Sequence, residues 1–135
     1  MYFRKDRDST YHRVTIHNLR VALADNPASM QQLRIAGTNI GIGIGLLAGG
    51  IALTTAGIIS TIHKNNAAQN AFNTASAQWY AQAQANPYAN NPMPTLPHYS
   101  ASPLIYIGAI TTFSCMIPLF NVGSHGRKAI ELYNR

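Results

Sequence analysis

The stretch from residue 35 to residue 62 reads IAGTNIGIGIGLLAGGIALTTAGIISTI and contains no charged side chain. Arg34 precedes it, and His63 and Lys64 follow it. As an α-helix, these residues would reach about 42 Å, which exceeds the roughly 30 Å hydrocarbon core of a bilayer. The stretch therefore predicts a membrane-spanning helix that is tilted or has its ends in the headgroup layers.

A second uncharged block, residues 99–124, has its apolar centre at 103–122. The chain offers no other large apolar surface against which two such helices would be hidden from lipid. We therefore predict an all-α membrane protein, a two-helix transmembrane hairpin with an amphipathic N-terminal arm and a helical, Pro-rich outer loop. The expected segments are an arm at 1–34, helices at 35–62 and 103–122, a loop at 63–102 and a tail at 123–135.

The basic residues are distributed unevenly around these blocks. The chain has ten Lys or Arg and four Asp or Glu, for a formal charge of +6. Nine of the ten lie before the first block or after the second: Arg4, Lys5, Arg7, Arg13, Arg20, Arg34, Arg127, Lys128 and Arg135. The loop between the blocks contains a single Lys or Arg, which is Lys64. The excess of Lys and Arg on the cytoplasmic side of membrane proteins predicts that both termini face the cytoplasm or the equivalent inner side.

Glycines recur every four residues in the first block, at Gly37, Gly41, Gly45 and Gly49, with Gly57 two steps further on. Ala52 and Ala56 belong to an adjacent stripe with the same spacing. Gly is unfavourable in a helix by about 0.8–1 kcal/mol relative to Ala, so the pattern needs a compensating interaction. Small residues four apart allow close approach of helix backbones in lipid. We predict a glycine-zipper packing face, with Gly108 on the second helix suited to meet it.

The flanking segments carry weaker signals. Ile16, Leu19 and Leu23 indicate a short amphipathic helix, which either lies on the membrane surface or belongs to a solvated arm. Asn26 followed by Pro27 predicts a helix start, because Asn caps helices and Pro is tolerated at the first helical position. Pro118 predicts a kink in the second membrane helix.

The loop divides into an Ala-rich part, residues 67–85, and a Pro-rich part, residues 86–102. The first part favours a helix whose stripe includes Trp79, with Tyr80 beside it. These aromatic residues are candidate membrane-interface anchors, together with Arg34, Lys64, Arg127 and Lys128. A solvated helix, or an extension of the first membrane helix that packs on a partner, also fits this pattern. The Pro-rich part predicts an extended return to the second helix.

The composition argues against an enzyme. Charged residues make up 10% of the chain, there is one Cys, and the five His are scattered over three segments. We expect no catalytic residue, no metal site and no cofactor. The sequence Gly43-x-Gly45-x-x-Ala48 matches part of a dinucleotide fingerprint, but it lacks the preceding strand and the acidic residue about 20 positions later.

Several motifs resemble a group of small, uncharacterised two-helix membrane proteins of Gram-negative bacteria. They are the run from Gly45 to Gly57, Ile107-Gly-Ala-Ile, Ile117-Pro-Leu-Phe, and Arg127-Lys-Ala-Ile-Glu-Leu-Tyr-Asn. The resemblance covers mainly the helices and the tail, and it implies a hairpin with both termini inside. It implies no activity for any named residue.

These features favour a non-enzymatic integral membrane protein, a structural or accessory subunit of a larger cellular or virion membrane assembly. A holin-like pore former and a membrane-anchored adaptor that binds partners through its arm or loop are the alternatives. The expected partners are the lipid bilayer, other membrane subunits or a second copy, and anionic headgroups at the basic termini. The modest number of basic residues favours headgroups over nucleic acid.

Overall fold

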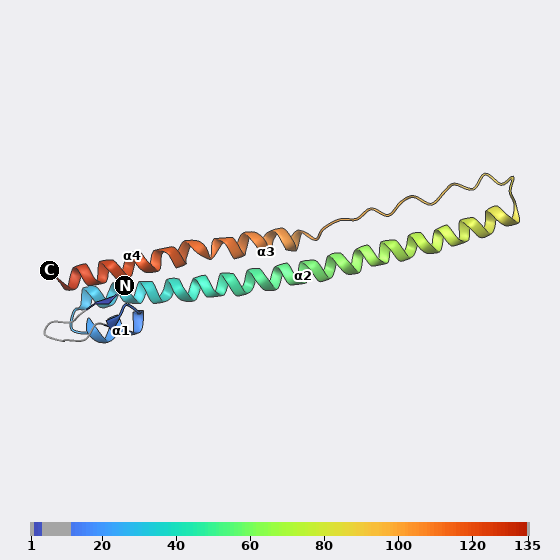
Figure 1. The fold of residues 1–135 in the computed structure, drawn as a ribbon. Helices are drawn as coiled ribbons and strands as arrows, with labels where there is room; N and C mark the ends of the chain where they lie inside the picture. Colours follow the sequence, from blue (N-terminus) through green and yellow to red (C-terminus); the bar gives the residue numbers. More distant parts are fainter. Residues whose placement is uncertain (1, 4–11, 135) are drawn as a thin grey trace. The chain divides into compact units, whose positions relative to one another are not determined.

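The computed structural model describes residues 2–3 and 12–134, and these are predominantly helical (Figure 1). The helices are α1 (Ile16–Ala22), α2 (Pro27–Ala85), α3 (Pro103–Ser114) and α4 (Met116–Tyr133). Two short strands, β1 (Tyr2–Phe3) and β2 (His12–Arg13), pair antiparallel. The predictions for Arg4, Lys5, Arg7 and Arg135 concern residues outside the described part of the chain.

Two helical stretches, Pro27–Ala85 and Pro103–Tyr133, are long and apolar enough to cross a membrane. This confirms the two predicted candidate spans. Only 17% and 11% of the residues in their most apolar windows are buried inside the chain. The core helices of a soluble protein bury most of their apolar face, so these stretches differ from such helices.

The chain divides into two compact units. The first comprises Met1–Gly49 and Ile110–Arg135, and the second comprises Gly50–Ala109. In the first unit, the beginning of α2 lies beside α4, with α1 at the same end (Figure 1). In the second unit, the remainder of α2 is accompanied by the Pro-rich segment and most of α3.

Helix α2 begins at Pro27, as the sequence predicts. The side-chain oxygen of Asn26 accepts a hydrogen bond from the backbone N–H of Ser29 at 3.1 Å, and the Asn26 carbonyl accepts from the Met30 N–H at 3.0 Å. Asn26 thus satisfies one of the free N–H groups of the first helical turn. The helix continues without interruption to Ala85, so the Ala-rich part of the loop extends the first apolar helix.

Helix α1 packs its apolar stripe inside the first unit. Thr15 caps it by accepting a hydrogen bond from the Asn18 N–H at 3.2 Å. Leu19, Ala22 and Leu23 are buried with Leu33 of α2 and Ala129 of α4 in one hydrophobic cluster. The predicted amphipathic helix is present, but its apolar stripe is covered by α2 and α4. This differs from both expected placements, on the membrane surface or in a solvated arm, because the ends of two helices supply a ready apolar surface.

The second apolar stretch has a break at Cys115, between α3 and α4. Pro118 explains its position, since proline lacks an N–H for the carbonyl four residues earlier, at Ser114, and its ring crowds that carbonyl. The Cys115 N–H instead donates to the Thr112 carbonyl at 3.3 Å, one residue closer than in an α-helix. The predicted kink therefore takes the form of a one-residue interruption.

The Pro-rich segment returns along α2 within the second unit. Trp79 Nε1 donates to the Asn91 carbonyl at 3.0 Å, and the Tyr99 hydroxyl donates to Gln69 Oε1. Near its end, the Ser102 N–H donates to Thr61 Oγ1 at 2.8 Å. As the segment advances from 91 to 102, its contacts move backward along α2 from 79 to 61, so it runs antiparallel to the helix.

Candidate functional site

Buried small residues recur every seven positions along α2. They are Ser29, Ala36, Gly43, Gly50 and Gly57, and we call this row the inner seam. Seven residues of an α-helix fall only about 20° short of two full turns. Residues seven apart therefore stay on one face. The second apolar stretch has its own buried small residues at the same spacing, Gly108 and Cys115, and Ala129 lies two further steps on.

In the first unit, the inner seam brings α2 close to α4. A Cβ at Gly43 would lie 2.7 Å from Leu119 Cγ and 3.5 Å from the Cys115 carbonyl oxygen. Further along, the Ser29 hydroxyl, which is fully buried, donates to the Ala129 carbonyl at 2.8 Å. The Asn26 side-chain amide donates to the Leu132 carbonyl at 3.2 Å, and His125 Nδ1 lies 2.9 Å from Gln32 Oε1. Small side chains and polar contacts therefore join these helices.

In the second unit, the approach of α2 and α3 is limited by backbone. A Cβ at Gly108 would lie 2.5 Å from the Thr54 backbone nitrogen and 2.7 Å from the Gly50 carbonyl oxygen. A Cβ at Gly57 would lie 2.7 Å from the Ile105 backbone nitrogen. Thr54 and Thr61 turn their hydroxyls back onto the carbonyls of Gly50 and Gly57, each at 2.9 Å, so these polar groups are satisfied within α2.

The glycines spaced four apart do not form one packing face with Gly57. A four-residue step turns the helix about 40° beyond a full turn, so Gly41 and Gly57 point in nearly opposite directions. Gly57 and Gly108 are buried at the helix contacts, whereas Gly41, Gly45 and Gly49 are exposed. Apart from the adjacent residues and the nearby backbone of α2 itself, no described atom lies within 4 Å of a Cβ added at any of these three. Gly37 is half-buried beside Arg20. Ala52 and Ala56 are exposed.

Sequence reasoning therefore missed four residues of the inner seam: Ser29, Ala36, Gly43 and Gly50. The available signal was the seven-residue recurrence of small side chains, which begins before the uncharged block. The more conspicuous four-residue glycine spacing obscured it. Both patterns are present in α2, and only the seven-residue pattern follows the faces buried within the chain.

The predicted interface residues are in different surroundings. Arg34, Lys64, Arg127 and Lys128 are exposed. Trp79 and Tyr80 form an edge-to-face ring pair with centroids 5.1 Å apart. Trp79 lies 17 residues beyond Ile62 in the same helix, which is about 26 Å further along the axis. Trp79 contacts the returning loop through the Asn91 carbonyl, and the role of the aromatic pair as an interface anchor stays a prediction.

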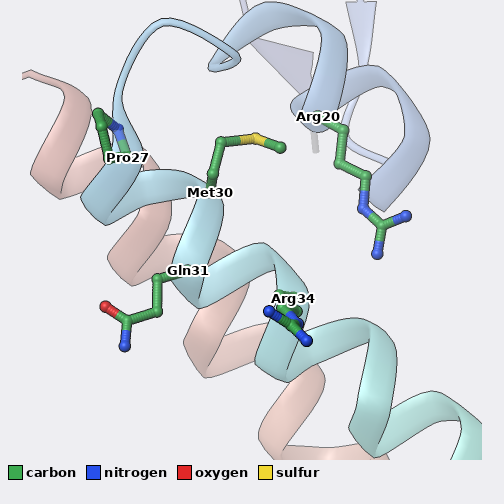
Figure 2. A pocket seen from close by; sticks show the side chains of 5 residues that line it. All are labelled: Arg20, Pro27, Met30, Gln31 and Arg34. Carbon is green, nitrogen blue, oxygen red and sulfur yellow. The ribbon is translucent and has the colours of Figure 1, made fainter.

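The described residues offer few reactive groups. Residues 2–3 and 12–134 contain no group of three His, Cys, Asp or Glu able to hold a metal ion. Cys115 is a buried free thiol within the helix contact. An open cavity of about 670 Å³ lies between α1 and the first turns of α2, with Arg20 and Arg34 among its lining residues (Figure 2).

Comparison with protein-family models, with curated proteins and with solved structures gave no match. The resemblance to small two-helix membrane proteins of Gram-negative bacteria therefore stays a prediction.

Proposed function

We propose that this chain is a non-enzymatic integral membrane protein that serves as a structural or accessory subunit of a larger membrane assembly. It inserts as a helical hairpin with both termini on the cytoplasmic side, in an inner membrane or a virion membrane. The length of the two apolar stretches and their small buried fraction support residence in lipid. The basic flanks and the nearly uncharged loop support the orientation.

The observation that carries the proposal is a second row of small residues on α2. Gly41, Gly45 and Ala48 are exposed, and Ala52 and Ala56 continue the row. We call this row the outer face. At 100° per residue it lies on the side of α2 opposite the inner seam. Because the inner seam already serves contacts within the chain, the outer face is available for another helix.

Packing in lipid supports an assembly role for such a face. Lipid tails are as apolar as Leu, so burial from water does not drive helix association within a bilayer. Association instead depends on close packing and backbone proximity, which small residues permit. Exposed bulky residues such as Ile42, Ile44 and Ile51 flank the outer face, so a shallow strip lies between larger side chains. The partner is another membrane subunit or a second copy of this chain.

The test compares Gly45 on the outer face with Gly43 on the inner seam, two residues away on the opposite side of α2. Gly45→Leu places a bulky side chain on the outer face, where nothing lies within 4 Å. We expect the variant to insert and fold, but to lose at least about tenfold in association, or about 1.4 kcal/mol. The readout is energy transfer between labelled copies in lipid vesicles, with co-purification of membrane partners as the second arm.

Gly123→Leu is the matched control, because Gly123 is also an exposed helical glycine with nothing within 4 Å. We expect Gly123→Leu to leave association unchanged. Gly43→Leu should instead disturb the contact with Leu119 and reduce the stability of the chain itself. If Gly45→Leu associates with itself and with co-purifying partners as strongly as the wild type, the packing proposal is wrong.

A further inference from the structure

The cavity between α1 and α2 is lined by residues of two chemical kinds. Arg20 comes from the last turn of α1, and Arg34 and Gln31 come from α2. Pro27 and Met30 supply apolar surface. Figure 2 shows the Arg20 side chain extending from α1 toward α2, with the Met30 side chain directed toward α1. The cavity therefore combines two guanidinium groups and an amide with an apolar wall.

Gly37 allows one of the guanidinium groups to lie close to α2. A Cβ at Gly37 would be 2.8 Å from Arg20 Nη2. Arg34 precedes Gly37 by three residues, so both positions lie on the same side of α2 in adjacent turns. The absence of a side chain at Gly37 thus leaves the head of Arg20 room beside the turn that carries Arg34.

Among the residues that the structure describes, no carboxylate lines the cavity. The described part of the chain contains two carboxylates, Asp25 and Glu131, and neither lines the cavity. Asp25 accepts a hydrogen bond from the Tyr133 hydroxyl at 3.4 Å. Two guanidinium groups at one open cavity attract an anion, and their planar donors match the oxygens of a phosphate group.

The location of the cavity indicates a lipid as the source of that phosphate. Arg34 is the last charged residue before the uncharged stretch of α2, and the exposed Ile35 follows it directly. In a membrane-inserted chain, this boundary lies at the headgroup layer of the inner leaflet. A ligand with a phosphate at one end and acyl chains at the other matches the change from arginine to isoleucine along the helix.

We propose that this cavity is a binding site for the phosphate of an anionic phospholipid. Arg20 and Arg34 donate hydrogen bonds to the phosphate oxygens, Gln31 contacts the polar headgroup, and the acyl chains lie along the apolar surface of α2 beyond Ile35. The site rests on the proposed membrane insertion but is independent of the assembly role. It also joins α1 to α2 through the ligand, so lipid binding stabilises the packing of the arm.

The test measures lipid retention by the full-length protein. The protein is purified in neutral detergent and mixed with phosphatidylglycerol or phosphatidylcholine, and bound lipid is counted by native mass spectrometry. We expect the wild type to prefer phosphatidylglycerol by about tenfold or more, given about 1 kcal/mol per arginine near an anionic headgroup. Arg20→Gln/Arg34→Gln should reduce this preference to a few-fold or less.

Arg127→Gln/Lys128→Gln is the matched control, because it removes the same charge from exposed positions of α4 that do not line the cavity. It should retain the preference for phosphatidylglycerol. An equal loss in the two double variants would mean diffuse charge attraction and would overturn the site. Arg20→Lys/Arg34→Lys keeps the charges but loses the planar donors, so an undiminished preference in this variant would also overturn it.

Inorganic phosphate separates the two possible sources of the anion. We expect millimolar phosphate to leave phosphatidylglycerol bound, because phosphate lacks the acyl chains. Saturable binding of phosphate in the absence of lipid, with no preference among lipids, would contradict a lipid site. Helical content by circular dichroism verifies that each variant is folded. Recovery of the chain as a soluble protein without detergent would refute the membrane proposal itself, which is a separate outcome.

Discussion

At the scale of single residues, the tolerance of each glycine to a methyl group depends on the face of the helix that it occupies. Gly108→Ala should destabilise the chain by about 1–3 kcal/mol, the usual range for overpacking. Its Cβ would be 2.5 Å from the Thr54 backbone nitrogen and 2.7 Å from the Gly50 carbonyl oxygen, and backbone atoms cannot rotate away. Unfolding in mixed micelles, followed by circular dichroism, gives the change in free energy.

Gly123→Ala provides the control for this measurement. Gly123 is exposed in α4 and has nothing within 4 Å, so alanine there should be neutral or stabilising by up to about 1 kcal/mol through helix propensity. Similar free-energy changes for the two substitutions would mean that α2 and α3 are not in backbone contact at Gly108.

Among the helices, Asn26 both caps α2 and contacts the end of α4, and two substitutions distinguish these roles. Its side-chain oxygen caps α2, and its side-chain amide donates to the Leu132 carbonyl at the end of α4. Asn26→Ala removes both interactions and should cost about 1–2 kcal/mol. Asn26→Asp keeps the cap acceptor and should cost less. Thermal unfolding in detergent compares them, and an equal loss for both variants would argue against the capping role.

The elements were predictable from the sequence to different degrees. Uncharged length identified both apolar helices, and Asn26-Pro27 located the start of α2, because these signals are local. The packing of α1 was not predictable, since its stripe is buried by Leu33 and Ala129, which lie far apart in the sequence. The four-residue glycine spacing was identified, but the contacts within the chain follow a seven-residue spacing, which stays on one face of a helix.

At the scale of the whole molecule, a structural subunit and a pore former differ in their effect on the membrane potential. The proposed function predicts that expression leaves the potential unchanged, because the polar groups of Thr54 and Thr61 are engaged within α2 or with the returning chain. A potential-sensitive dye measures this in intact cells. Rapid depolarisation at expression levels that leave the membrane otherwise intact would favour the holin-like alternative.

Co-purification of partners with loop variants distinguishes the adaptor alternative. If the chain recruits partners through its outer loop, shortening the Pro-rich part should abolish co-purification of those partners. The proposed function expects partners to be lost on substitution of Gly45 and retained when the exposed Tyr88 and Leu96 are replaced by Ser. Loss of the partners through the loop substitutions alone would identify an adaptor.

The proposed hairpin crosses a bilayer twice with both ends inside. Sided labelling tests it with single cysteines at exposed positions in a Cys115→Ala background: Arg13→Cys, Leu96→Cys and Asn134→Cys. With a membrane-impermeant thiol reagent, we expect that intact spheroplasts label only Leu96→Cys, and that inverted vesicles label only Arg13→Cys and Asn134→Cys. Labelling of Arg13→Cys and Asn134→Cys from opposite sides would contradict the proposed hairpin.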